Sequence, residues 1–417
     1  MNTGLPVNTG RGVAAAVIAI AVLAGGCGTS TSTSTSTSSS AAPARRPVSL
    51  PLATSLAGDQ ATWAVVPMGA ASGPNLFWQL FELPAGGGSW RLATPPDVGT
   101  NGAIAIGVQA GQSLVAGIHP SLLLDFSPVT STPNGGRTWS AGAPNPGLAD
   151  VPDALGTAPL GGQLIALNRR GSAELARGGK SGWINLTSTR ALAASPAGRA
   201  CQLTQLTAVA FEPSGTPALA GTCGRPGIAG IFAFQGGTWR AAGPSLPASL
   251  NGRTTQVLRL TRIGARLTAV LQAGTGRASS LFTAWTTGSQ TAGNQWRLSA
   301  ALRLAGRSVV SSSFGNGGGA VLVLSGGRGE YLAGPGASWQ PLPRLPPGRT
   351  VTLALPAGGV VNALATNGSI LTAWRLHAGQ HAGAGTSAGA GSGGTTASTT
   401  WVKTQQTRVP IQYGSSG

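Results

Sequence analysis

Acidic residues, histidines and tyrosines are all scarce in this sequence. It has nine Asp and Glu residues against 27 Lys and Arg, three His and two Tyr, and its formal net charge is +18. Three histidines leave little material for a metal site or a Ser-His-Asp triad, and neither a G-x-S-x-G motif nor a phosphate-binding loop is present. We therefore expect no metal, no cofactor and no catalytic residue.

The few acids and histidines that lie near one another are placed in loop-like sequence. Asp150 and Asp153 fall in a Pro- and Gly-rich connection, where paired carboxylates could serve glycoside hydrolysis, although solvated loop charges are the simpler interpretation. His377 and His381 have the spacing of two metal ligands on a helix, but the Gly- and Ala-rich run around them disfavours a helix.

Long apolar runs are also missing, with one exception at the N-terminus. The run Gly12–Gly26 has the length of the apolar part of a signal peptide and is short for a membrane span. Its end, Leu23-Ala24-Gly25-Gly26-Cys27, resembles the lipobox of bacterial lipoproteins, with Ala24 where that family usually has Leu. The resemblance implies a signal peptide over residues 1–26 and a lipidated Cys27. Such a protein is anchored to the cell membrane by lipid and faces its extracytoplasmic side.

The composition after Cys27 divides the chain further. Residues 27–47 are rich in Ser and Thr with nothing to bury, and we expect a flexible tether there. The folded domain is expected over residues 48–417. Within it, residues 377–400 are almost entirely Gly, Ala, Ser and Thr, which predicts a disordered loop inside the last repeat.

Cysteine is rare, and the three present are accounted for. If Cys27 carries lipid, Cys201 and Cys223 remain as an even pair in a compartment where disulfides persist. A strand over Leu203–Phe211, a turn at Glu212–Gly215 and a returning strand would bring both cysteines to the open end of one hairpin. We predict a disulfide; the alternative is two separately buried thiols.

What the sequence does have is a repeat. Gly-rich turns followed by Trp recur at nearly regular intervals, at Trp90, Trp139, Trp183, Trp239, Trp296 and Trp339, and a seventh Trp motif, TASTTW, ends at Trp401. Short runs rich in Val, Leu, Ile and Thr lie between them, and no sustained helical pattern is present in the domain. A period of about 50 residues built from short strands is typical of a β-propeller. The predicted fold is all-β, with seven blades of antiparallel strands after the signal peptide and tether.

One repeat carries a more specific motif. The residues Thr132, Asn134, Gly136, Thr138 and Trp139 resemble the Asp-box, or BNR repeat, with Asn134 where the family usually has Asp. Asp-box propellers include sialidases, other carbohydrate-active proteins, sortilin-type receptors and photosystem II assembly factors. The motif is a structural turn, so the resemblance implies a propeller and transfers no catalysis.

Two functions from different classes follow. The first is a non-enzymatic, lipid-anchored propeller that binds or scaffolds a partner in the cell envelope: a protein, a carbohydrate or an anionic polymer, with no nucleic acid expected. Between Pro213 and Gly329 there are eleven Arg and no acid. This predicts a sector for anionic ligands, although a GC-rich genome would also enrich Arg; its residues are Arg259, Arg262, Arg266, Arg277, Arg297, Arg303 and Arg307.

The alternative is a carbohydrate-active enzyme of sialidase-like fold, an exo-sialidase or another glycoside hydrolase. Sialidase chemistry needs three Arg, a Tyr nucleophile beside a Glu, and an Asp acid. Tyr331 and Tyr413 are the only tyrosines, and Glu330 beside Tyr331 would point to the opposite face of a strand. Three acids and an Arg cluster converging at the channel mouth would favour the enzyme; a mouth without carboxylates would favour the binding protein.

Overall fold

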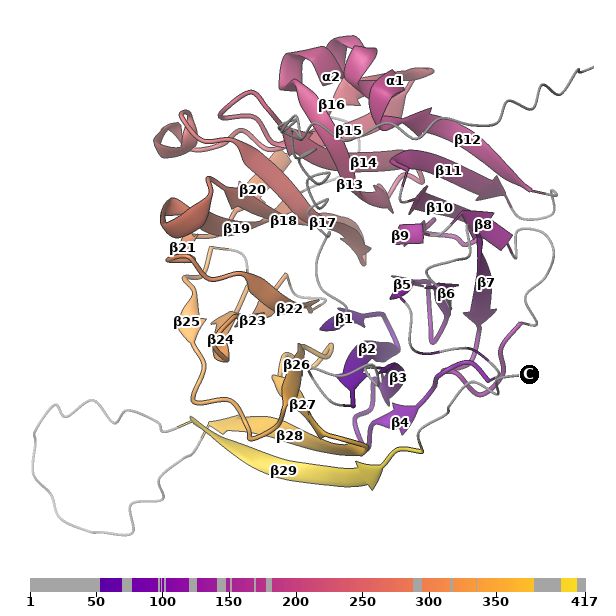
Figure 1. The fold of residues 1–417 in the computed structure, drawn as a ribbon, viewed down its shortest axis with the longest axis vertical. Coiled ribbons are helices and arrows are strands. Elements are labelled where there is room, and N and C mark those ends of the chain that lie inside the picture. Colours follow the sequence, from indigo (N-terminus) through magenta and orange to yellow (C-terminus); the bar gives the residue numbers. More distant parts are fainter. Residues whose placement is uncertain are drawn as a thin grey trace, which may run out of the picture. The chain divides into compact units, whose positions relative to one another are not determined.

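Short antiparallel sheets follow one another around a common centre in this protein (Figure 1). The computed structural model describes residues 53–410 apart from positions 70–76, 97, 99, 101–102, 120–125, 141–147, 151, 169, 178–181, 288–294, 316–317, 335 and 379–398. Within these residues the strands form seven units of four, each unit continuous in sequence. The predicted seven-bladed β-propeller is thereby confirmed.

The first three blades occupy the N-terminal part of the ring. Blade 1 contains β1 (Ala53–Ala57), β2 (Ala61–Met68), β3 (Phe77–Pro84) and β4 (Arg91–Leu92). Blade 2 contains β5 (Ala103–Val108), β6 (Leu114–His119), β7 (Phe126–Thr132) and β8 (Leu148–Asp150). Blade 3 contains β9 (Pro152–Thr157), β10 (Gln163–Asn168), β11 (Ser172–Arg177) and β12 (Trp183–Ser188).

Blades 4 and 5 share one hydrogen-bonded sheet, because β14 also pairs with β17. Blade 4 contains β13 (Leu203–Phe211), β14 (Pro217–Cys223), β15 (Gly230–Gln235) and β16 (Thr238–Ala241). Blade 5 contains β17 (Thr255–Ile263), β18 (Arg266–Ala273), β19 (Ser280–Thr287) and β20 (Gln295–Leu298). Two 3-10 turns, η1 (Ala248–Leu250) and η2 (Gly276–Ala278), and the short β21 (Leu302–Arg303) lie in their connections.

The last two blades complete the ring. Blade 6 contains β22 (Val309–Phe314), β23 (Ala320–Leu324), β24 (Arg328–Leu332) and β25 (Gln340–Pro341). Blade 7 contains β26 (Thr350–Ala354), β27 (Asn362–Asn367), β28 (Ile370–Ala378) and β29 (Thr399–Arg408). The innermost strands β22 and β1 pair in parallel, so blades 6 and 1 meet directly at the centre.

Every blade has the same chain direction, which gives the ring two different faces. We call the face at which each innermost strand begins the proximal face, and the opposite one the distal face. The turns between first and second strands, and between third and fourth, lie on the distal face. The turns between second and third strands, and the connections from one blade to the next, lie on the proximal face. The first described strand, β1, therefore begins at the proximal face.

The hydrophobic core is divided among the seven blade interfaces, and each interface holds one motif Trp. Trp296, for example, packs on the cluster between blades 4 and 5, and its Nε1 donates to the carbonyl of Ala242 at 2.6 Å. Trp339 packs in the same way between blades 5 and 6, and its Nε1 donates to the carbonyl of Ala300 at 3.0 Å. The remaining motif residues occupy the other interfaces: Trp90, Trp139, Trp183, Trp239 and Trp401. The sequence repeat is thus the repeat of an inter-blade contact.

Blades 7 and 1 close the ring without exchanging a strand. The side chain of Gln405 in β29 accepts from the backbone N–H of Trp90 at 2.8 Å and donates to its carbonyl at 2.9 Å. Nearer the centre, Thr350 of β26 donates to the carbonyl of Pro67 at 2.8 Å. The backbone N–H of Gly69 also donates to the carbonyl of Gly368 at 3.3 Å, as an isolated bridge between the two blades. Closure therefore rests on packing, on this bridge and on a few side-chain hydrogen bonds to backbone.

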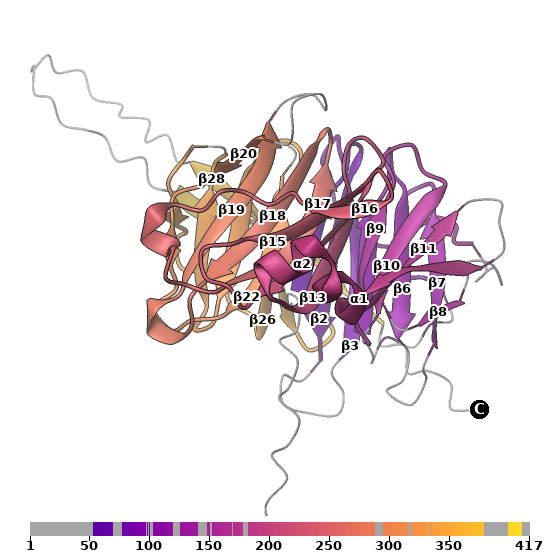
Figure 2. The same ribbon diagram turned by 90° about the horizontal axis from the view of Figure 1, so that it is seen from above.

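The predicted disulfide is present, but its first cysteine lies on a helix. Cys201 ends α2 (Pro196–Cys201), which follows α1 (Thr189–Ala194) on the rim between blades 3 and 4 (Figures 1 and 2). Cys223 is paired in register with Leu203, so the hairpin holds the two Cα atoms 5.1 Å apart. Each helix has six residues and a serine N-cap, Ser188 or Ser195. One turn and a half is too short to produce the helical periodicity that sequence reading relies on.

Two other expectations concern the loop at residues 377–400 and the N-terminal segment, which lie largely outside the described residues. Strands β28 and β29 extend the last hairpin to Ala378 and from Thr399, and most of the loop predicted at 377–400 lies outside the described residues. Residues Pro47–Gly417 form one unit by their contacts, separate from Met1–Arg46. In the described part of the chain, no helix combines the length and the apolar character needed to cross a membrane.

Candidate functional site

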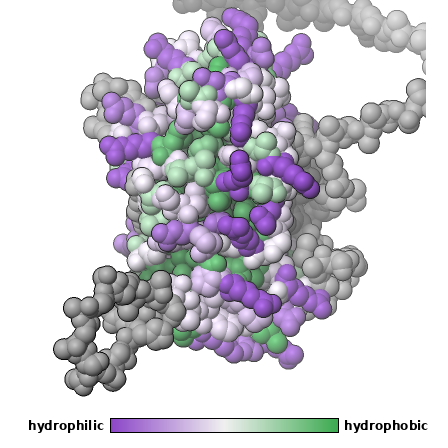
Figure 3. All heavy atoms as spheres, turned by 90° about the vertical axis from the view of Figure 1, so that its left-hand side faces the viewer, coloured by the Kyte–Doolittle hydropathy of each residue, from purple (hydrophilic) through white to green (hydrophobic). Residues whose placement is uncertain are grey.

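Positive charge is concentrated in the second half of the ring. After Glu212 the sequence contains 15 arginines, one lysine and a single acid, Glu330. Glu330 is buried in β24 and is ion-paired with Arg328. Blades 5, 6 and 7 thus carry almost no compensating charge, and hydrophilic side chains cover much of the ring edge in Figure 3, with apolar surface between them.

The hairpin geometry sorts these arginines by face. Arg266, at the start of β18, is exposed on the distal face, whereas Arg277, in the next turn, is exposed on the proximal face. Among the described residues after Glu212, the distal turns carry only Arg262 and Arg266. The proximal face carries a larger set, which we call the proximal arginines: Arg225, Arg253, Arg277, Arg303, Arg307, Arg344, Arg349 and Arg408.

The seven arginines predicted as one sector are therefore divided. Arg277, Arg303 and Arg307 are all exposed on the proximal face. Gly306, which precedes Arg307 in the chain, lies next to Arg277: an ideal Cβ on this glycine would be 3.5 Å from the Cγ of Arg277. Arg297 is exposed on the outer strand β20. Arg262 and Arg266 lie on the distal side.

Arg259 has a different place from the other six. It lies on β17 and points to the innermost strands of blades 6 and 1: its Nη1 donates to the Oγ of Ser312 at 3.0 Å, and its Nη2 donates to the carbonyl of Ser55 at 3.3 Å. The guanidinium also lies 5.3 Å from the ring centre of Phe314. Burial lowers the pKa of Arg259 to about 10. This residue links three blades at the centre of the propeller.

Three glutamates of the ring are engaged within their own blades. Glu82 in β3 is buried and accepts two hydrogen bonds from Arg91, at 2.9 and 2.7 Å. Glu174 in β11 accepts from Asn168 at 3.1 Å. These acids and Glu330 are on third strands of three separate blades. Nowhere among residues with described positions do three or more His, Cys, Asp or Glu side chains gather.

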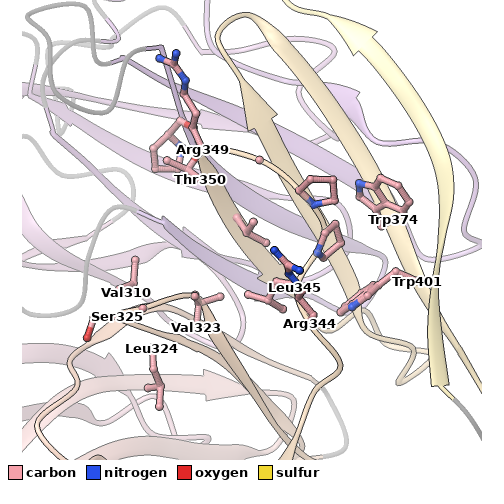
Figure 4. Close-up of a pocket in the computed structure, with 17 residues that line it drawn as sticks. Val310, Val323, Leu324, Ser325, Arg344, Leu345, Arg349, Thr350, Trp374 and Trp401 are labelled. Carbon is pink, nitrogen blue, oxygen red and sulfur yellow. Dashed lines mark hydrogen bonds between the residues drawn. The ribbon is translucent and has the colours of Figure 1, made fainter.

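A cavity of about 920 Å³ opens on the proximal side between blades 6 and 7. Trp374 of β28 and Trp401 of β29 form one wall, and Val310, Val323 and Leu324 of blade 6 lie opposite (Figure 4). Leu345, Pro346 and Pro347, from the connection between the blades, contribute further apolar surface. Most of the lining is therefore apolar, as is usual for sites that hold part of a ligand.

The charged side chains beside this apolar surface are both positive. Arg344 and Arg349 are both exposed and both line the cavity, and no described lining residue is an acid. The Nε1 atoms of Trp374 and Trp401 are buried and lack a hydrogen-bond partner among the described residues. In Figure 4 the nitrogen edge of Trp374 faces the other lining residues. The cavity thus offers the positive charge of two arginines beside apolar and aromatic surface, a set that fits an anionic group attached to an apolar one.

The turn of blade 2 predicted from the Asp-box resemblance is a compact, hydrogen-bonded loop on the distal side. Asn134 accepts from the backbone N–H of Thr138 at 3.0 Å and donates to its hydroxyl at 2.8 Å, while Thr132 accepts from the N–H of Gly136 at 2.9 Å. Gly136 has φ of +78°, and a Cβ there would lie 2.5 Å from that of Ala93. Trp139 packs between blades 1 and 2. The turn fastens two blades and lies far from the cavity in the ring order.

The other residues singled out from the sequence lie away from the cavity and the proximal arginines, or lie outside the described residues. Cys27 lies outside the described residues. His377 is exposed on β28, Asp153 is exposed at the start of β9, and His381 is not described. Sequence reasoning missed the cavity, whose residues come from several strands and one connection far apart in sequence. The only signal was Arg344-Leu345-Pro346-Pro347, a basic and proline-rich connection.

The chain is similar to several solved structures at low sequence identity. YCF48 from Cyanidioschyzon merolae is 14% identical, with 79% of this chain and 93% of that chain covered and a TM-score of 0.45. A structure of YCF48 bound to D1 peptide is 13% identical, with coverage of 79% and 91% and a TM-score of 0.41. The WD40 repeats of RRP9 are 10% identical, with coverage of 76% and 87% and a TM-score of 0.45. No family model matches the chain, and no curated protein matches it.

Proposed function

We propose that this protein is a lipid-anchored, non-enzymatic binding module of the cell envelope, and that its partner is held in the proximal cavity between blades 6 and 7. The anchor is Cys27, at the end of the lipobox-like sequence. The single observation that carries the binding site is the composition of the cavity: two indoles and aliphatic side chains beside two arginines, without a described carboxylate.

This composition sets the class of ligand. Arg344 and Arg349 favour a carboxylate, phosphate or sulfonate, since guanidinium forms strong, charge-assisted hydrogen bonds with planar and tetrahedral anions. Trp374 and Trp401 favour an apolar or aromatic group attached to that anion. The proximal arginines around the ring add a field that attracts such a partner and raises its association rate.

The distribution of acids supports binding rather than glycoside hydrolysis. Hydrolysis by the usual routes needs two carboxyl groups within about 5–10 Å of each other on either side of a sugar. Glu82 and Glu330 are instead each buried against an arginine of the same blade. Their hydrogen bonds assign them to stabilising the outer halves of blades 1 and 6.

A dye titration tests the site directly. The aromatic anion 8-anilinonaphthalene-1-sulfonate should bind the purified protein saturably, with energy transfer from tryptophan. Val310→Trp places a large side chain at a cavity residue that is 39% exposed, and it should weaken binding at least tenfold. Val360→Trp is the matched control, because Val360 is 41% exposed and lies on a distal turn.

The charge requirement needs its own variant. Arg344→Gln/Arg349→Gln should weaken binding of the sulfonate while leaving the unfolding transition unchanged, because both side chains are exposed. Equal losses for Val310→Trp and Val360→Trp, or no effect of the arginine pair, would refute the cavity as the binding site.

A further inference from the structure

We infer that the proximal face lies against a membrane surface that contains anionic lipid, so that the protein has a fixed orientation on its membrane. The charge of the ring supports this orientation independently of any anchor. The position at which β1 begins supports the same orientation, and this second argument rests on the lipid anchor of the proposed function.

The charge of the ring is directed toward one side. The connection between blades 5 and 6 places Arg303 and Arg307 in solvent on the proximal face, and Arg277 is exposed beside them. On the distal side of the same two blades, the exposed arginines among the described residues are Arg266 at the turn between β17 and β18 and Arg297 on the outer strand β20. Because acids are absent between Pro213 and Gly329, no local carboxylate neutralises the proximal group. A group of exposed arginines on one face is complementary in charge to a surface of anionic headgroups.

The path of the chain points to the same side. The first strand, β1, begins at the proximal face with Ala53. Only the segment Gly28–Leu52 separates Cys27 from that point, and Arg45 and Arg46 are its only charged residues. A lipid at Cys27 therefore delivers the proximal face to the membrane first.

This orientation has a consequence for the cavity. The cavity opens on the proximal side, next to Arg344 and Arg349. On a membrane with this orientation the cavity faces the lipid surface. Its ligand would then be presented at that surface, rather than arriving from the solvent side of the protein.

Vesicle sedimentation with unlipidated protein tests the inference without the anchor. Residues 47–417 are used, because they contain every described strand of the closed ring. We expect them to sediment with vesicles of phosphatidylcholine and phosphatidylglycerol, not with pure phosphatidylcholine, and to be released as salt approaches about 0.5 M. If the dye titration fails but this binding is seen, the inference stands without the proposed cavity function.

Matched pairs of variants decide which face binds. Arg303→Gln/Arg307→Gln should lower the partition coefficient by about 25-fold, since each arginine at an anionic surface contributes roughly fivefold. Arg177→Gln/Arg266→Gln removes the same charge from exposed distal positions. It should change binding by less than about threefold, because charges farther from the membrane than the Debye length are largely screened. Equal losses in the two pairs would overturn the orientation.

A spectroscopic readout covers the case in which a variant folds poorly. A cysteine carrying an environment-sensitive fluorophore replaces the exposed Ser308 on the proximal side or the exposed Ser214 on the distal side. Anionic vesicles should shift the emission at Ser308→Cys alone. Emission shifts at both positions, or at Ser214→Cys alone, would contradict the inference. So would binding to soluble dextran sulfate with no binding to anionic vesicles, which would identify a polymer partner instead.

Discussion

Single side chains in this protein mainly fasten blades to one another. Gln405 bridges the ring closure through the backbone of Trp90, and Arg259 links the innermost strands of blades 5, 6 and 1. Both are polar groups whose partners lie far away in sequence, so no local pattern identifies them. The Asp-box-like turn is the opposite case: its residues are close neighbours along the chain, and its hydrogen bonds follow from the local sequence.

Asn134 provides a test of that local turn. Asn134→Ala removes the acceptor for the N–H of Thr138 and should lower the free energy of unfolding by about 1 kcal/mol. Asn134→Asp keeps the acceptor, and the Thr138 hydroxyl can then donate, so its stability should stay close to that of the wild type. Urea denaturation of both variants measures this. A loss for Asp as large as that for Ala would contradict the assigned hydrogen bonds.

Arg259 makes a prediction about alkaline pH. Burial lowers its pKa to about 10 in the folded protein, well below the value in the unfolded chain, so the unfolded chain binds the proton more tightly. Below about pH 9 both states are charged and this residue gives no pH dependence. As pH rises through 10, the wild type should gain stability relative to Arg259→Met. Urea unfolding of both proteins across this range measures the difference; a difference that stays constant would contradict the burial of the guanidinium.

Among the elements, the strands were predictable and the short helices were not. Strand β13 has the limits predicted from the sequence, Leu203–Phe211, and the spacing of Trp predicts the blade count. Helices α1 and α2 are six residues long and end at the disulfide, so their sequence shows no periodicity. Trp139 lies in the loop after β7 rather than in the outer strand β8, although its packing position matches the other six.

Arginine placement shows a further limit of linear reading. Arg266 and Arg277 are close in sequence, yet the strand between them carries the chain across the blade and puts them on opposite faces. A sector defined by sequence neighbours is therefore divided by the fold, and a face is assembled from turns of several blades. The cavity between blades 6 and 7 arises in the same way and could not be read from any one repeat.

Trp296 tests the role of the motif tryptophans. Trp296→Ala should lower the free energy of unfolding by about 3 kcal/mol, since it removes a large side chain from the interface between blades 4 and 5. Trp296→Phe keeps most of the packing and loses the hydrogen bond to Ala242, which costs about 1 kcal/mol. Arg297→Gln, at the exposed neighbouring position, is the control and should be neutral in denaturant unfolding. A neutral Trp296→Ala would show that the repeat does not mark the interfaces.

At the scale of the whole molecule, the proposed function joins an anchor, a tether and a ring with two unlike faces. The anchor has a direct test in cell fractionation. Wild-type protein should partition into the detergent phase. Cys27→Ala cannot receive the lipid and should yield no processed, lipidated protein in that phase. Mature wild-type protein that is wholly aqueous, or that has an unmodified Cys27, would eliminate the lipid anchor.

The most direct test of binding through the proximal cavity is photo-crosslinking in living cells of the source organism. A benzophenone amino acid replaces Val310 in the cavity or, as the control, the equally exposed Val360 on the distal side. We predict one adduct of defined mass at position 310, none at position 360, and a weaker adduct at 310 when Arg344→Gln and Arg349→Gln are added. Equal adducts at the two positions, or none at 310 while the protein is present in the membrane fraction, would contradict a binding site in this cavity.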